Sequence, residues 1–247
     1  MGDRRIRLLH TADVHLGGGA EGVSALRAIT GVLDLALAER VDLLLIAGDL
    51  FDDNRPKAPV VDHAIAEINR FPGPVVLLPG NHDCLDHGSI YRKVDFEAAC
   101  PNLTLLQDPA GHHHHLGDLG IRFWGRPVVE HAPEFQPLAN VPERHGDDWH
   151  VVVGHGLVIG DHEDSYRSSP IRPREIAATG WDYVALGHVH PARDVSAGGI
   201  AAHYSGSPVT WGHLHDTIGF AIIADLDPAA GVTIRKERVG APVAAVS

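Results

Sequence analysis

The sequence has few of the residues that mark several common classes of protein. Its 247 residues include two cysteines, one methionine and 6% aromatic residues. Two cysteines are too few for the disulfide framework of a small secreted domain, and reduced thiols are typical of the cytoplasm. No apolar run approaches the roughly 18–20 residues that span a bilayer. The sequence therefore predicts a cytoplasmic protein without a membrane segment.

Positive charge is also scarce. Lysine and arginine number 20 against 32 aspartates and glutamates, which gives a formal net charge of -12. Proteins that hold long nucleic acids usually carry a basic surface that offsets the repulsion of the phosphates. The charge therefore argues against tight, autonomous binding of duplex DNA.

Metal-binding residue types follow five short apolar runs in a fixed order. The runs, at 6–10, 43–47, 75–78, 151–153 and 183–186, are short enough for buried strands. After them come Asp13 and His15, Asp49, Asn81 with His82 and Asp83, His155, and His188 with His190. Strands that end at one edge of a sheet can aim such side chains into a shared crevice.

These ligand types indicate a centre of two metal ions. Imidazole, carboxylate and amide oxygen suit Mn, Fe or Zn better than the all-oxygen shell of Ca or Mg. Two cations roughly 3.5–4 Å apart polarise a phosphoryl oxygen and activate a bridging water. Taken alone, Asp13 with His15 and Gly48 with Asp49 are more typical of a cap or turn than of a site, and Gly80–Asp83 is as typical of one as of the other. Their joint order at strand ends predicts phosphate-ester hydrolysis.

The ordered motifs resemble the calcineurin-like metallophosphoesterases over most of the chain. Residues 9–17, 45–52 and 204–208 look like the SbcD-type DNA repair exonuclease branch. The resemblance implies a four-layer α/β/β/α sandwich, an architecture that the strand and helix pattern accommodates. It also implies two divalent ions, with Mn as first choice and Fe or Zn as alternatives.

The resemblance further implies the roles of the motif residues. The ligands would be Asp13, His15, Asp49 and His190 for one ion and Asp49, Asn81, His155 and His188 for the other, with Asp49 as the bridge. His82 would donate a proton to the leaving oxygen, and Asp83 would orient it. An imidazole with an ordinary pKa near 6.5 is a workable general acid at neutral pH.

Two residues after the second strand are candidates for substrate contact. Asp52 stands where some nucleases of this branch carry a histidine near the scissile phosphate. Arg55 offers a cation for a phosphate, although an ordinary loop residue before Pro56 explains it equally well.

Two further histidine motifs need separate interpretation. Gly212–His215 repeats the spacing of Gly187–His190, but it follows a turn-forming cluster and not a strand, so it is not assigned to metal. His213 and His215 are expected to line the cleft at most. The run His112–His115 looks like an affinity tag but is internal, and we expect a surface loop or adventitious metal binding there.

The coarse pattern predicts one domain with two sheets. Apolar residues recur at helical spacing in 23–40 and 59–69, between the first strands. After Pro101 the pattern becomes strand-rich, at 103–106, 121–124, 151–153, 183–186, 220–226 and 232–236, which predicts a second sheet on the first. No stretch is typical of a linker, so a single metallophosphoesterase domain is expected over 1–247, without an evident DNA-capping domain.

The predicted function is a phosphodiester hydrolase, exonuclease-like, in which metal-bound hydroxide attacks phosphorus in line. The acidic charge restricts the expected DNA to short or single-stranded forms, unless a partner supplies contacts; the resemblance implies an ATPase partner. One alternative is a small-molecule phosphodiesterase or phosphatase acting on cyclic or linear nucleotides. Non-enzymatic alternatives are a catalytically silent scaffold and a histidine-rich metal buffer. The sequence does not fix the oligomeric state.

Overall fold

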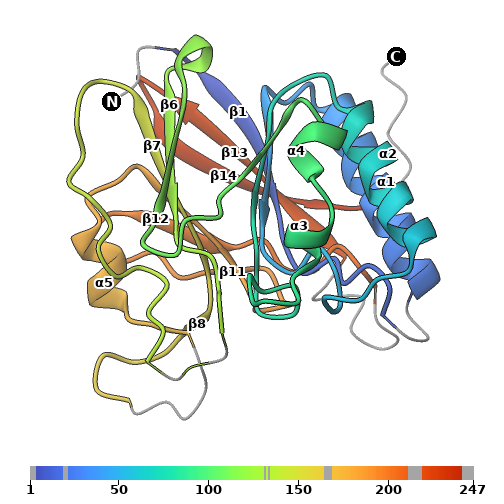
Figure 1. Ribbon diagram of the computed structural model, residues 1–247. Coiled ribbons are helices and arrows are strands. Elements are labelled where there is room, and N and C mark those ends of the chain that lie inside the picture. The colour runs from blue at the N-terminus through green and yellow to red at the C-terminus, as the bar shows by residue number, and fades with distance from the viewer. Residues whose placement is uncertain are drawn as a thin grey trace.

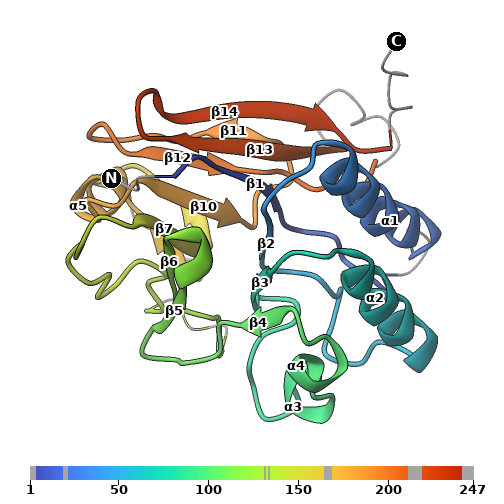
Figure 2. The same ribbon diagram turned by 90° about the horizontal axis from the view of Figure 1, so that it is seen from above.

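Two six-stranded sheets pack face to face, with helices on their outer faces (Figure 1). The computed structural model describes residues 4–18, 22–130, 132, 134–163, 169–210 and 219–240. Viewed from above, α1 and α2 lie on one side of the sheets and α5 on the other (Figure 2). The predicted four-layer α/β/β/α sandwich is confirmed.

The first sheet has the strand order β14-β13-β1-β2-β3-β4. Its strands are β1 (Ile6–Thr11), β2 (Leu43–Ala47), β3 (Val75–Leu78), β4 (Leu103–Leu105), β13 (Phe220–Asp227) and β14 (Gly231–Arg238). β1 to β4 run parallel, whereas β13 is antiparallel to β1. Because every residue of β2 is buried, its sequence is a continuous apolar run without alternation.

The second sheet has the strand order β11-β12-β10-β7-β6-β5. Its strands are β5 (His112–Leu116), β6 (Ile121–Gly125), β7 (Trp149–His155), β10 (Tyr183–Gly187), β11 (Arg193–Asp194) and β12 (Ala201–Tyr204). The four inner strands are parallel, and the two edge strands are antiparallel to them. A separate parallel pair is formed by β8 (Leu157–Val158) and β9 (Pro170–Ile171).

Helices cover the outer faces of both sheets. They are α1 (Gly22–Ala38), α2 (Ala58–Arg70), α3 (Ile90–Lys93), α4 (Phe96–Ala99) and α5 (Pro173–Ala178), with a 3₁₀ turn at Gly117–Leu119. α2 begins with a proline in its first turn, where a missing N–H costs no helical hydrogen bond. None of the helices in the described ranges is long and apolar enough to cross a membrane.

Alternating side chains of the first sheet enter two different cores. Leu8 and Leu45 pack between the sheets with Val151 and Tyr183. The alternate residues, such as Leu44, pack against the helices α1 and α2. A third cluster lies between the second sheet and α5. Both faces of the central strands are therefore apolar, and polar side chains concentrate where those strands end.

The structure corrects two expectations. The strands β4, β13 and β14 belong to the first sheet and not to the second, because an apolar pattern shows which residues are buried but not which strand is the partner. The run His112–His115 forms the edge strand β5 and not a surface loop. Four identical polar residues give no periodicity from which a strand can be inferred.

Candidate metal centre

The predicted metal ligands converge from the carboxyl ends of strands in both sheets. They follow β1 (Asp13 and His15), β2 (Asp49), β3 (Asn81), β7 (His155, its last residue) and β10 (His188 and His190). Parallel strands place their carboxyl ends at one edge, where binding crevices form. The site therefore lies at the junction of the two sheets, and each sheet supplies part of it.

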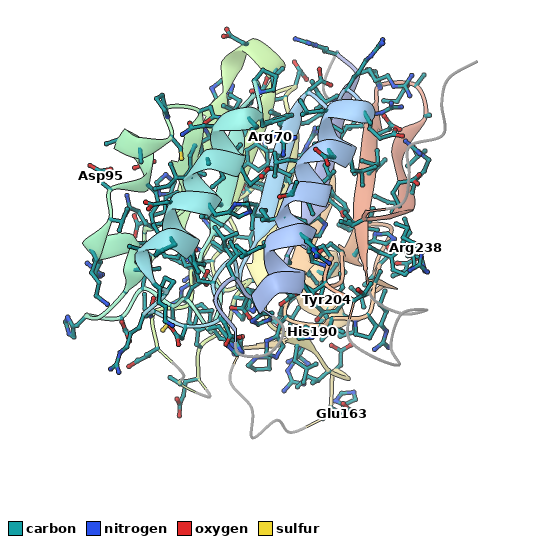
Figure 3. The ribbon with its side chains drawn as sticks, turned by 90° about the vertical axis from the view of Figure 1, so that its right-hand side faces the viewer. Arg70, Asp95, Glu163, His190, Tyr204 and Arg238 are labelled. Carbon is teal, nitrogen blue, oxygen red and sulfur yellow. The ribbon has the colours of Figure 1, made fainter. Side chains whose placement is uncertain are left out.

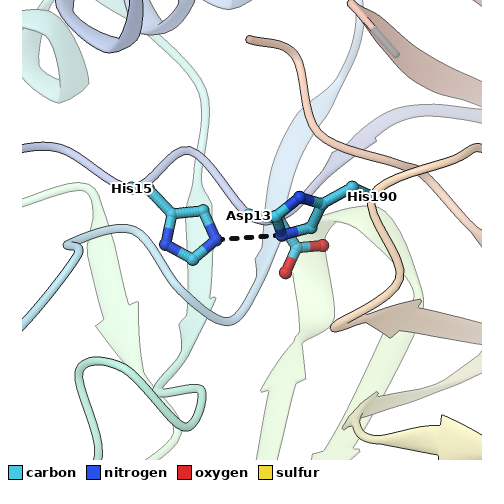
Figure 4. A group of neighbouring side chains, drawn as sticks. All are labelled: Asp13, His15 and His190. Carbon is cyan, nitrogen blue, oxygen red and sulfur yellow. Dashed lines mark hydrogen bonds between the residues drawn. The ribbon is translucent and has the colours of Figure 1, made fainter. Parts of the chain in front are cut away.

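The first predicted ligand set lies together. Figure 4 shows Asp13, His15 and His190 around one point, and ligand atoms of the three lie within 4.8 Å of one another. The Nε2 atoms of His15 and His190 are 3.2 Å apart. Asp49 Oδ2 lies 3.9 Å from His15 Nε2. Figure 3 shows His190 at the lower end of the helices, where the loops that carry the predicted ligands come together.

The second set is held by closer contacts. His155 Nε2 lies 3.2 Å from Asp49 Oδ2 and 3.0 Å from Asn81 Oδ1. His188 Nδ1 lies 2.8 Å from the same Asn81 oxygen. Asp49 thus stands between the two sets, in the position that a bridging carboxylate requires.

The donor atoms of this site fit a divalent cation. His155 Nδ1 lies 2.9 Å from the carbonyl oxygen of Ala47, which only accepts hydrogen bonds, so Nδ1 carries a proton. In the neutral ring, Nε2 then carries a lone pair and no proton. This nitrogen nevertheless faces the oxygens of Asp49 and Asn81, which are acceptors too. Acceptors that converge in this way need a proton or a metal ion between them.

Electrostatics separate the roles of these side chains. Burial disfavours charge on both Asp49 and His155, but their mutual attraction outweighs it, raising the pKa of His155 to about 9 and holding that of Asp49 well below its usual range. Burial lowers the pKa of His15 and of His188 to about 4. These two imidazoles are neutral at pH 7 and can offer lone pairs. Burial raises the pKa of Asp13 to about 7, a shift that a bound cation would reverse.

Four predicted ligands have strained backbone. Asp13, His15, Asp49 and His188 have φ angles of 55°, 54°, 52° and 98°. Residues other than glycine rarely adopt positive φ, and each such conformation costs roughly 1–3 kcal/mol. Hydrogen bonds hold them: the Asp13 N–H donates to Gly48 O at 3.1 Å, and the His188 N–H donates to the Asp13 carboxylate at 3.0 Å. Such strain is typical of functional sites.

Glycines before the ligands permit close approach of the loops. A Cβ on Gly80 would lie 2.2 Å from Asp49 Oδ1, and one on Gly48 would lie 2.0 Å from His155 Nδ1. Glycine is thus required at both positions by space.

His82 lies at the mouth of the site, with its side chain 44% exposed. The backbone N–H of His82 donates to Asp49 Oδ1 at 2.8 Å, and the ring Nδ1 donates to the Asp52 carbonyl oxygen at 2.8 Å. Nε2 is therefore the ring atom left for substrate. The Asp52 carboxylate, predicted to contact substrate, lies 3.2 Å from His15 Nδ1 and can orient that ring.

The Asp83 carboxylate is fully buried and bonds to the loop. It accepts hydrogen bonds from Gly80 N at 2.8 Å, Phe51 N at 3.1 Å and the Tyr91 hydroxyl at 2.6 Å. Through these bonds Asp83 positions the loop that carries His82, and the role of Asp83 in orienting His82 stays a prediction. Nothing in the sequence around Tyr91 marked its part in this arrangement.

The remaining predicted residues lie around the site or outside the described ranges. Arg55 lines a hollow of about 360 Å³ together with Asn81 and His82. Ser207 was missed as an individual residue, although the motif at 204–208 signalled its segment; its hydroxyl donates to the Asp13 carbonyl at 2.7 Å. His213 and His215 lie outside the described residues.

A model of the calcineurin-like phosphoesterase family matches residues 6–192. The chain belongs to this family. It therefore carries a metal-dependent phosphoesterase domain, and the clustered His and Asp side chains are able to bind divalent metal.

Known relatives of this calcineurin-like chain include two longer proteins. It is 27% identical over 227 residues to the uncharacterized metallophosphoesterase YhaO of Bacillus subtilis, covering 82% of this chain and 53% of the relative. It is likewise 27% identical over 227 residues to the DNA double-strand break repair protein Mre11 of Methanopyrus kandleri, covering 82% and 49%. The chain thus spans about half the length of these relatives.

Solved structures show the same fold. The protein TT1561 of Thermus thermophilus matches with a TM-score of 0.59 at 11% identity, over 95% of this chain and 99% of that one. A novel archaeal phosphodiesterase matches with a TM-score of 0.52 at 14% identity, over 95% and 100%. At these identities the likeness concerns the fold alone.

Proposed function

We propose that this calcineurin-like phosphoesterase hydrolyses phosphodiesters at a two-metal centre, with exonuclease-like action on DNA as its leading activity. The supporting observation is the place of His82, whose backbone contacts the bridging Asp49 while its ring lies beside the hollow. The two ligand sets would hold two divalent ions, with Mn as first choice and Fe or Zn as alternatives. Bound ions would polarise the phosphoryl oxygen and balance charge that develops on the attacking and leaving oxygens.

The residues around the centre then have separate tasks. His82 Nε2 protonates the leaving oxygen, because Nδ1 is tied to the Asp52 carbonyl. Arg55 offers a cation to a phosphate in the hollow. The Asp52 carboxylate orients the His15 ring, and Asp83 holds the loop on which His82 lies.

Short or single-stranded DNA is the proposed substrate, with an ATPase partner for longer DNA. Support comes from the relative named as a DNA double-strand break repair protein. The net charge of -12 favours short DNA, because no excess of basic residues offsets the repulsion of a long duplex.

A second candidate is the hydrolysis of small nucleotide diesters. The hollow beside His82 has a volume of about 360 Å³, within the roughly 300–1,000 Å³ of pockets that take small molecules. The acidic net charge favours this candidate as well.

The experiment is hydrolysis by metal-stripped protein re-supplied with Mn. The substrates are bis-p-nitrophenyl phosphate, p-nitrophenyl phosphate, and labelled single- and double-stranded DNA. His82→Ala should lower turnover by roughly 10²–10⁴-fold, the usual contribution of a general acid. His87→Ala, an exposed histidine in the same loop, is the matched control and should keep full activity.

The outcomes separate the candidates. DNA degradation that His82→Ala abolishes supports the nuclease. Turnover of the diester without DNA cleavage moves the assignment to small nucleotides. Turnover unaffected by His82→Ala contradicts its role as proton donor, and no turnover on any substrate favours a catalytically silent scaffold.

A further inference from the structure

Ser207 lies between the two segments that carry ligands of the first predicted ion. It is fully buried in the stretch between β12 and β13. Its hydroxyl donates to the Asp13 carbonyl oxygen at 2.7 Å, and its backbone N–H donates to the His190 carbonyl oxygen at 2.8 Å. Asp13 follows β1 of the first sheet, whereas His190 follows β10 of the second. Ser207 therefore joins the backbones of two ligands that come from different sheets.

The Asp13 carbonyl group needs such a donor. Asp13 is fully buried, and it lies beyond the last residue of β1, where the regular hydrogen bonds of the sheet have ended. Its φ angle of 55° is one that residues other than glycine rarely adopt. Buried backbone carbonyls are nearly always paired, because an unpaired one loses its bond to water without replacement. The Ser207 hydroxyl thus stabilises the backbone conformation from which the Asp13 carboxylate reaches the site.

Neighbouring bonds fix the direction of the Ser207 hydroxyl. The Val209 N–H donates to the hydroxyl oxygen at 3.2 Å, which leaves the hydroxyl hydrogen for the Asp13 carbonyl. The Ser207 carbonyl accepts a hydrogen bond from the N–H of Gly219 at 2.8 Å, directly before β13. Because β13 pairs with β1, the same sheet that carries Asp13 also anchors Ser207.

Gly206 permits the contact with the His190 segment. A Cβ on Gly206 would lie 2.6 Å from the His190 carbonyl oxygen, closer than the two atoms can approach. Its φ angle of 75° also favours glycine. The backbone before Ser207 is therefore shaped to lie directly against the backbone of His190.

We propose that Ser207 is a positioning residue for the first metal ion, which sets the placement of Asp13 relative to His190. The inference rests on the proposed two-metal centre. Among the residues that the structure describes, the hydrogen bonds of Ser207 reach none of the ligands that belong to the second ion alone, which are Asn81, His155 and His188. Loss of the hydroxyl should therefore weaken the first ion selectively.

The test measures Mn binding to the metal-stripped full chain by equilibrium dialysis and calorimetry. Ser207→Ala should weaken one of two ions by roughly 10–100-fold, the usual cost of losing a group that holds a metal ligand in place, and change the other by less than about threefold. Ser205→Ala is the matched control, because Ser205 is also fully buried but its hydroxyl donates within the loop, to the Gly206 carbonyl at 3.1 Å. Both ions should bind to this control within about twofold of their original affinity.

His190→Ala identifies the ion that Ser207→Ala loses. His190→Ala removes a ligand of the first ion and should leave one bound ion. Adding Ser207→Ala to it should change the affinity for that remaining ion by less than about threefold, because both substitutions act on the same site and their effects do not add.

Other results overturn the inference. Two ions bound to Ser207→Ala as tightly as to the unmodified protein would show that the hydroxyl does not position the ligands. Equal weakening of both ions would indicate a general loss of structure, which contradicts a selective role. Because binding is measured without substrate, absent phosphodiester hydrolysis counts against the proposed activity alone. Uptake of fewer than two ions by the unmodified protein contradicts the two-metal centre and this inference together.

Discussion

At the scale of single residues, the glycines before the ligands are as important as the ligands. Gly80→Ala should reduce metal affinity and turnover by at least about tenfold, because its Cβ would lie 2.2 Å from Asp49 Oδ1 and displace the bridging carboxylate. Gly88→Ala is the matched control in the same loop, where the nearest atom to an added Cβ is Asp86 Oδ1 at 3.4 Å. Metal titration and bis-p-nitrophenyl phosphate turnover measure both. Equal metal affinity and turnover in the two variants would show that the loop shifts to accommodate the added Cβ without displacing Asp49.

The same scale shows what sequence can predict about a site. The side chains that converge at the site were predictable because they closely follow apolar runs, and their role as metal ligands stays a prediction. The hydrogen bond from the Tyr91 hydroxyl to Asp83 was not predictable, because bonds between separate segments depend on three-dimensional placement.

At the scale of elements, an ion pair joins β1 to β13. Arg7 lies opposite Asp225, with Nε to Oδ1 at 2.8 Å and the second guanidinium nitrogen to Oδ2 at 3.3 Å. The pair lies in the half of β1 that is remote from Asp13. Because Asp225 is largely buried, Arg7→Gln should lower the free energy of unfolding by roughly 1–3 kcal/mol and leave turnover unchanged.

Urea unfolding measures this effect. Arg5→Gln is the comparison, because Arg5 is 60% exposed and lies 3.5 Å from the same carboxylate, so its loss should cost less than about 1 kcal/mol. Equal losses for the two variants would contradict the assignment of the stabilisation to Arg7.

Sheet membership is the part of the fold that local pattern could not supply. The strands at 220–226 and 232–236 were predicted with nearly the right bounds, but they were placed in the wrong sheet. A buried apolar segment can pair with any strand whose buried faces match, and only the assembled chain shows that β13 lies beside β1.

At the scale of the whole molecule, a buried histidine between the sheets couples stability to pH. His10 Nδ1 on β1 lies 3.0 Å from the Tyr183 hydroxyl on β10, and burial lowers the pKa of His10 to about 3. Between that value and the unfolded pKa near 6.5, the unfolded chain binds one proton more than the folded chain. The free energy of unfolding therefore falls as pH falls through this window, by about 1.4 kcal/mol per pH unit from this residue.

The double variant His10→Leu with Tyr183→Phe should lose this part of the slope. Replacing both partners leaves no buried hydroxyl without a bond. Unfolding in EDTA between about pH 4.5 and 6.5, inside the window set by the two pKa values, measures the slope without metal binding. His87→Leu, exposed and remote from the sheet interface, is the control. An unchanged slope in the double variant would show that His10 does not carry the coupling.

The pairing of β1 with β13 also has a consequence for synthesis of the chain. β1 can pair with β2 once residues 43–47 have been synthesised, but its other edge must wait for residues 220–227. Until then β1, a strand that is mostly buried in the folded protein, presents unpaired N–H and C=O groups, and such edges recruit strands from other chains. Pairing between distant segments also slows folding. The nascent protein thus passes through a stage that is prone to aggregation, which ends only when β13 emerges from the ribosome.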